Sequence, residues 1–196
     1  MTVSKLNFNK SLEDLPKHAV VVDKMSGLEE IVSQEFNLVI FPREYCEDRA
    51  DFARLIGTSA FYGDISLAHN GLYHSSVHPA KKSFLEDFVF LANLMNKLQE
   101  DTRVAYEPTH KIHHGAWHQD PGFTINYTLV GPGGLWSPND NICDDEPVDL
   151  NLVRQFKTQH IAIYKGEAED NPAGPLFHSP PIRLKPEERI LMQLYL

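Results

Sequence analysis

The second half of the chain is a succession of short strand-like segments separated by turns. In the run FTINYTLV at 123–130, Ile125, Tyr127 and Leu129 alternate with polar residues, which is typical of a strand with two different faces. The sequence GPGG at 131–134 then forces a turn. Further strands are predicted at 103–106, 135–136, 160–166, 176–178 and 189–196. Many short strands between turns predict a closed or sandwiched antiparallel sheet.

The first half of the chain carries the helical signals. Between 81 and 100, apolar residues recur at spacings of three and four, which is the pattern of one helix face. Shorter helices are predicted over 28–36 and 47–56, with a strand at 37–41 between them, and 62–80 is interpreted as a loop.

Together the two halves predict an α+β fold with a β-barrel or jelly-roll core and helices packed on one face. We expect a single domain over 1–196. In it, 1–102 supply mainly helical support and the first strands, and 103–196 form the core that carries the candidate site.

Composition limits the class of protein, its partners and its expected location. A length of 196 residues with 42% hydrophobic residues fits a soluble globular domain. The net charge of −9 argues against nucleic acid as the main partner, because contacts to phosphates need basic patches. Cys46 and Cys143 predict no disulfide, and neither a signal peptide nor an apolar run of membrane-spanning length is apparent. We therefore expect a cytoplasmic protein without a membrane partner.

Three residues in this half have side chains that bind metals. His118 and Asp120 are two positions apart, so on a strand both side chains point to the same face. His178 follows 58 residues after Asp120, on another predicted strand. Two imidazoles and one carboxylate on one face of an ion are the facial triad of non-haem Fe(II) oxygenases, although ligand type alone also suits zinc, manganese or nickel.

An arginine opens the last predicted strand. Arg189 lies 11 residues after His178, and its guanidinium offers a fork that fits a carboxylate. Arg183, five residues after His178, is the competing candidate. On the strand at 123–130, either Tyr127 or the pair Asn126 and Thr128 could donate a hydrogen bond to a cosubstrate, because the alternation excludes both sets together.

The order His118-X-Asp120, His178 and then Arg189 on the terminal strand resembles the Fe(II)/2-oxoglutarate-dependent oxygenases over about 103–196. The resemblance implies a double-stranded β-helix, or cupin-like jelly roll. It also implies Fe(II) held by the two histidines and the aspartate, 2-oxoglutarate as cosubstrate held by Arg189, and hydroxylation of a small-molecule or peptide substrate with O₂. That superfamily often carries a serine two residues after the arginine, where this chain has Leu191.

The wider sequence also resembles a bacterial family known only as a domain of unknown function. The likeness is carried by WHQD at 117–120, VGPG at 130–133, YKGE at 164–167 and FHSP at 177–180, with LVIF at 38–41 as its extension into the first half. This second resemblance implies no reaction.

Other interpretations of the same residues remain. His118 and Asp120 could be a surface hydrogen-bonded pair. His114 and His118 are four apart, a zinc spacing on a helix that Gly115 disfavours. The jelly roll could serve a cupin-type metalloenzyme without 2-oxoglutarate, a non-enzymatic binding protein or a degenerate oxygenase. The sequence predicts neither the substrate nor the oligomeric state.

Overall fold

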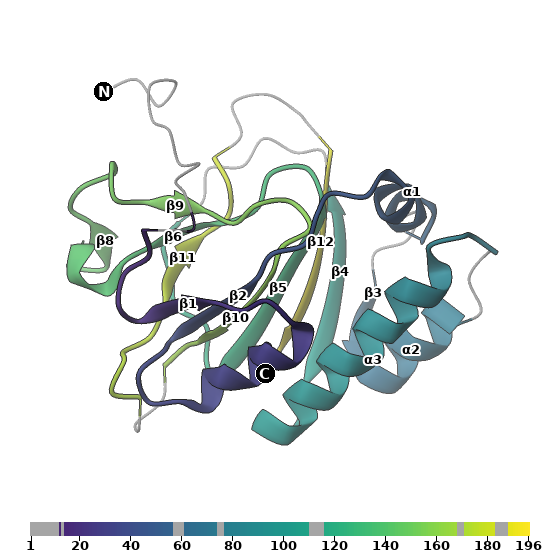
Figure 1. The fold of residues 1–196 in the computed structure, drawn as a ribbon, viewed down its shortest axis with the longest axis horizontal. Coiled ribbons are helices and arrows are strands. Elements are labelled where there is room, and N and C mark those ends of the chain that lie inside the picture. Colours follow the sequence, from purple (N-terminus) through teal and green to yellow (C-terminus); the bar gives the residue numbers. More distant parts are fainter. Residues whose placement is uncertain are drawn as a thin grey trace.

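A seven-stranded sheet is the centre of the computed structural model, which describes residues 12, 14–56, 61–73, 77–109, 116–167, 171–182 and 188–196. Neighbouring strands of this sheet run antiparallel except β1 and β2, which are parallel (Figure 1). In spatial order the strands are β1 (Ala19–Val21), β2 (Leu38–Phe41), β10 (Ile161–Lys165), β5 (Phe123–Val130), β12 (Arg189–Tyr195), β4 (Arg103–Thr109) and β3 (Phe61–Asp64).

Smaller elements complete the described fold. A three-stranded sheet has the order β11 (Phe177–Ser179), β6 (Leu135–Ser137) and β9 (Arg154–Gln155), and a two-residue hairpin pairs β7 (Ile142–Cys143) with β8 (Glu146–Pro147). The helices are the 3₁₀ helices η2 (Met25–Val32) and η3 (Asn139–Asn141), and the α-helices α1 (Glu47–Ile56), α2 (Ile65–Tyr73) and α3 (Lys81–Leu98).

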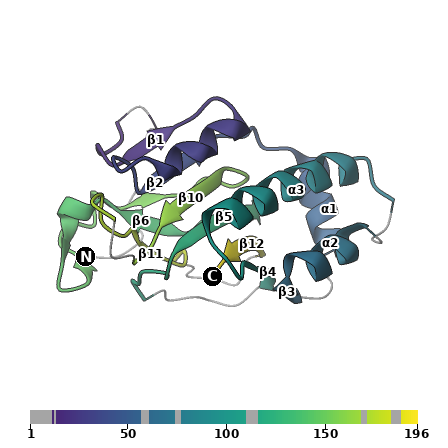
Figure 2. The same ribbon diagram turned by 90° about the horizontal axis from the view of Figure 1, so that it is seen from below.

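The two faces of the large sheet bury different neighbours. Ile125, Tyr127 and Leu129 of β5 belong to a core cluster that they share with apolar residues of α1, α2, α3 and η2. Tyr164 of β10 belongs to a second cluster, together with Trp136 of β6 in the small sheet. Helices therefore cover one face of the large sheet and the small sheet lies over the other (Figures 1 and 2). This arrangement confirms the predicted α+β class with helices on one face.

Several elements agree with the sequence predictions. β5 and α1 have the predicted limits, and α3 ends two residues before the predicted end of its helix. In α3 the apolar residues spaced three and four apart are buried, and in β5 both the apolar and the polar residues of the alternation are buried.

Two predictions for the first half were wrong. The segment interpreted as a loop contains β3 and the helix α2, which buries Ala68 and Leu72 against the core. Its helical spacing is short and is interrupted by Asn70 and Gly71, which weaken the local signal. The helix predicted over 28–36 is the 3₁₀ helix η2, which begins earlier and ends at Val32.

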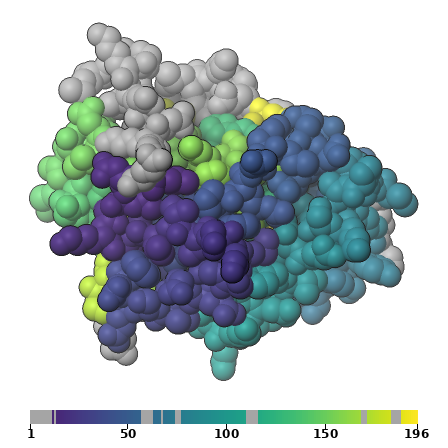
Figure 3. Space-filling model, in the orientation of Figure 1, coloured from purple at the N-terminus to yellow at the C-terminus, as the bar shows by residue number. Residues whose placement is uncertain are grey.

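The N-terminal part of the described chain and the helices form one continuous outer surface. In the space-filling view the purple segment with β1 and η2 meets the teal α3 along the covered face of the sheet (Figure 3). None of the helices in the described ranges combines the length and the apolar character that a bilayer crossing requires.

The half-buried imidazole of His160, just before β10, makes stability depend on pH. Burial, and secondly the charge of Lys157, lowers the pKa of His160 from 6.5 to about 4. Because the folded state disfavours the protonated ring, the stability present above pH 6.5 should be lost as the pH falls from 6.5 towards 4. We expect His160→Gln to lose less stability than the natural protein between those values. Urea unfolding at both ends of the range measures this, and equal losses would contradict it.

Candidate metal centre

A short bridge between two chain segments brings the candidate ligands together. The backbone N–H of His118 donates to the carbonyl of His178 at 2.9 Å, and the reverse bond measures 3.1 Å. His178 lies in the middle of β11, where it pairs with Trp136 of β6. The small sheet therefore positions one histidine, and the other joins it through paired backbone bonds across 60 positions of sequence.

The side chains of His118, Asp120 and His178 converge. Nε2 of His118 lies 3.6 Å from Oδ1 of Asp120, and Nε2 of His178 lies 3.3 Å from Oδ2. One candidate ligand atom from each residue lies within 4.8 Å of the others. The side chains are 46%, 21% and 7% exposed for His118, Asp120 and His178, so the group opens to solvent on the His118 side. The donor set and its spacing fit a divalent metal ion.

Backbone carbonyls orient both imidazoles. Nδ1 of His118 lies 3.1 Å from the carbonyl of Ala116, and Nδ1 of His178 lies 3.3 Å from the carbonyl of Leu176. These contacts fix the orientation of each ring, with Nε2 turned towards Asp120. This arrangement is the usual outer support of metal-bound histidines.

A glycine lets the chain pass directly behind the carboxylate. The N–H of Glu167 donates to the carbonyl of Asp120 at 2.9 Å, and the N–H of Gly166 donates to the carbonyl of Gly122 at 2.6 Å. A Cβ at position 166 would lie 1.6 Å from the Asp120 carbonyl oxygen. Only glycine permits this approach, which holds the backbone of the His-X-Asp segment against the end of β10.

Tyr164 is the site residue that sequence reasoning missed. Its hydroxyl donates to Oδ2 of Asp120 at 3.3 Å and lies equally far from Nε2 of His178. Its ring stacks on Phe156, which in turn stacks on Trp136. The available signal was weak: Tyr164 belongs to the strand-like run before Gly166, but nothing in that run indicates that its side chain faces His118 and Asp120.

Electrostatics favour an ionised carboxylate beside a protonated phenol. Burial raises the pKa of Asp120, but the hydrogen bond and charge of His178, with the charge of His118, outweigh this effect, and the net pKa lies below its ordinary value. Burial, and then the charge of Asp120, raises the pKa of Tyr164 well above its ordinary value. Tyr164 therefore remains a hydrogen-bond donor.

The other candidate residues lie on two different faces of the large sheet. Asn126 pairs with Ala162, which lies in the cluster of Tyr164, so Asn126 and Thr128 face the metal candidates. Tyr127 points the opposite way, into the core beneath the helices, and only the other two remain candidates for a cosubstrate contact. Arg189 is buried, and its Nε donates to the carbonyl of Pro132 at 3.1 Å. Arg183 lies outside the described residues.

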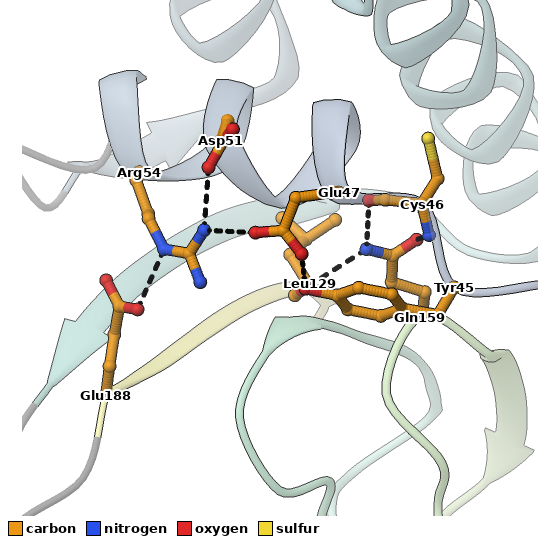
Figure 4. Close-up of polar contacts among 8 residues, drawn as sticks. All are labelled: Tyr45, Cys46, Glu47, Asp51, Arg54, Leu129, Gln159 and Glu188. Atoms are coloured by element: carbon orange, nitrogen blue, oxygen red, sulfur yellow. Dashed lines mark hydrogen bonds and ion pairs between the residues drawn. The ribbon is translucent and has the colours of Figure 1, made fainter.

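Helix α1 braces the end of the sheet where Arg189 begins β12 (Figure 4). Arg54 donates from Nε to Glu188 at 2.9 Å and from Nη1 to Glu47 and Asp51. A second link runs through Gln159, whose amide bonds both the N–H and the carbonyl of Cys46 at 2.9 Å. The residue that precedes Arg189 is thus tied to the helix layer.

His69 and His78, which the structure describes, do not join the metal candidates. His69 lies in α2 and stacks with Tyr73, and His78 stacks with Phe52. His74, His110, His113 and His114 lie outside the described residues. Trp117 lines a hollow of about 180 Å³ beside His118.

Two solved structures to which this chain is similar are described as a dioxygenase and a hydroxylase. The dioxygenase for auxin oxidation 1 from Arabidopsis thaliana, in a complex with 2-oxoglutarate, has a TM-score of 0.52 and 11% identity, with 91% of each chain covered. A Pseudomonas putida prolyl-4-hydroxylase has a TM-score of 0.47 and 8% identity, with 87% of this chain and 92% of that chain covered. At these identities the likeness to the first structure shows the fold alone.

The family is shown by the sequence itself. The model of the family described as "Protein of unknown function (DUF1826)" matches residues 22–194, so the chain belongs to this family. The search of curated proteins finds no match. The predicted membership of a family of unknown function is thereby confirmed, and the predicted resemblance to the oxygenases is confirmed for the fold alone.

Proposed function

We propose that this protein is a non-haem Fe(II) oxygenase of the double-stranded β-helix type that uses 2-oxoglutarate and hydroxylates a small-molecule or peptide substrate. The observation that carries the proposal is the convergence of His118, Asp120 and His178 within 4.8 Å on a fold of oxygenase type. These three residues would hold the iron, which supplies O₂ activation coupled to oxidative decarboxylation of 2-oxoglutarate.

The other residues would bind and orient the cosubstrate. Arg189 is buried on the metal-facing side of β12, where a guanidinium can pair with the distal carboxylate in a region shielded from water. Asn126 and Thr128 on the neighbouring β5 face the same side. The hydroxyl of Tyr164 would keep Oδ2 of Asp120 in place by donating a hydrogen bond to it.

An anaerobic titration with Fe(II), with and without 2-oxoglutarate, tests the proposal. We expect a visible metal-to-ligand charge-transfer band that is lost in His118→Ala and weakened in Arg189→Ala. Tight metal binding without the band would overturn 2-oxoglutarate use and point to a cupin-type metalloenzyme. Failure to bind metal would overturn the enzyme proposal.

Arg54 provides a prediction about cosubstrate affinity. The ion pair of Arg54 with Glu188 is partly exposed at 37% and 34%, so breaking it removes at most about 1 kcal/mol. If all of this free energy is lost from the positioning of Arg189, Arg54→Ala should bind 2-oxoglutarate about fivefold more weakly. We expect unchanged Fe(II) affinity, measured by titration of the charge-transfer band.

The control removes a more exposed ion pair, between Lys97 and Glu29 at 3.1 Å, in the last turn of α3. Lys97→Ala should leave both affinities unchanged. If Arg54→Ala binds 2-oxoglutarate as tightly as Lys97→Ala does, the ion pair between Arg54 and Glu188 does not position Arg189.

A further inference from the structure

A second cavity opens on the sheet away from the metal candidates. It has a volume of about 610 Å³ and is lined by Gly63, Asp64, Asp101, Thr102, Arg103 and Tyr195. These residues come from β3, from the turn after α3, from the start of β4 and from the end of β12. The volume lies in the range of roughly 300–1,000 Å³ that is typical of small-molecule sites.

The strand registers place this cavity on the metal-facing side of the sheet. Gln193 pairs with Asn126 of β5, so its side chain lies on the face of the metal candidates. Tyr195 is two residues further along β12 and shares that face. Arg103 pairs with Tyr195 across the strands, and Asp64 pairs with Arg103.

The resulting row of side chains is continuous. It leads from Tyr164, which contacts Asp120 and His178, across β5 and β12 to the cavity at β4 and β3. Neighbouring strands are about 4.8 Å apart, so the cavity begins only a few strands from the metal candidates. A ligand held there would lie along the same sheet face as the proposed iron.

Opposite charges line this cavity without neutralising each other. In the ranges that the structure describes, neither the guanidinium of Arg103 nor the carboxylate of Asp101 forms an ion pair or a side-chain hydrogen bond.

We propose that this cavity binds the substrate and that the substrate is a small zwitterion of the α-amino-acid type. Arg103 would pair with its carboxylate, and Asp101 with its ammonium group. The hydroxyl of Tyr195 would supply a further hydrogen bond. The assignment rests on the proposed oxygenase function, because that function makes the neighbouring metal group a reaction centre.

The test measures binding by ¹H–¹⁵N NMR of the whole labelled protein without iron. The probes are a panel of common L-amino acids, with n-pentylamine and pentanoate as compounds that carry only one of the two charges. At least one amino acid should shift the backbone amides of Asp101, Thr102 and Arg103 saturably, and neither single-charge compound should do so. Shifts by pentylamine or pentanoate of equal size, or no shift by any amino acid, would overturn the proposal.

Variants test the two charges separately. Arg103→Gln and Asp101→Asn should each weaken amino-acid binding by at least about tenfold, the effect of losing one charge-assisted bond. Asp101 has a φ of 56°, a left-handed conformation that asparagine also tolerates. Asp144→Asn, at a φ of 51° and outside the cavity, is therefore the matched control and should bind normally. Unchanged binding in both cavity variants would contradict the proposal.

The amino-acid binding test and the oxygenase test can fail independently of each other. A charge-transfer band without amino-acid binding would leave the oxygenase standing and overturn the substrate class. Amino-acid binding without a band would uphold the zwitterion site and overturn its role as a substrate site. Both signals, with succinate formation stimulated by the bound amino acid, would support the two proposals together.

Discussion

Asp120→Asn is expected to weaken binding of Fe(II), or of Zn(II) as a stable substitute, by at least about 100-fold. Replacing residues that merely support metal ligands already costs 10- to 100-fold, and this change removes the only carboxylate of the convergent group. Asparagine keeps the volume and one oxygen, so the fold should be retained. Calorimetric titration of the metal-free protein measures the affinity.

Asp145→Asn is the matched control for this change. Asp145 lines the small hollow beside His118 but is not part of the convergent group, so its variant should bind metal as the natural protein does. The two proteins should also differ in thermal stability with metal present, because a ligand that binds only the folded state raises the unfolding midpoint. Equal affinities for the two variants would exclude Asp120 as a ligand.

Gly166→Ala is expected to destabilise the fold and to weaken metal binding, because it displaces the backbone of Asp120. The added Cβ would lie 1.6 Å from the carbonyl oxygen of Asp120 and 2.6 Å from its carbonyl carbon, so the His-X-Asp backbone must move away from β10. Overpacking of this kind costs about 1–3 kcal/mol of unfolding free energy. The displaced carboxylate should also bind metal more weakly. Urea unfolding and metal titration of the same variant measure both effects.

The control for this variant is another glycine-to-alanine change. Gly71 lies in α2, and a Cβ there would meet no atom within 4 Å. Gly71→Ala should therefore stabilise the protein by up to about 1 kcal/mol, as alanine does in exposed helix positions, and leave metal binding unchanged. If Gly166→Ala retains full stability and metal affinity, the close approach at Gly166 does not support the site.

Local periodicity explains which parts of the fold were predictable. α3 and β5 carry long, regular apolar patterns, and their limits follow from sequence. α2 and η2 are short, and their helical form depends on burial of Leu72, Leu28 and Ile31 against the core. Nucleating a short helix is costly, so such segments are helical mainly because of tertiary packing, which the local sequence does not encode.

Part of the candidate site could likewise be predicted from the sequence, and part of it depended on the tertiary structure. The sequence by itself predicted that His118 and Asp120 share a face, from the two-residue spacing of an extended chain, and it identified His178 and Arg189 by residue type and order. Only the tertiary structure decided that Tyr164 joins them, that Tyr127 faces the helices, and that Gly166 lies against the Asp120 backbone. These outcomes depend on which strands become neighbours and which sheet face each helix covers. Strand order and layer packing arise from contacts between segments far apart in the chain, and a local pattern contains no record of them.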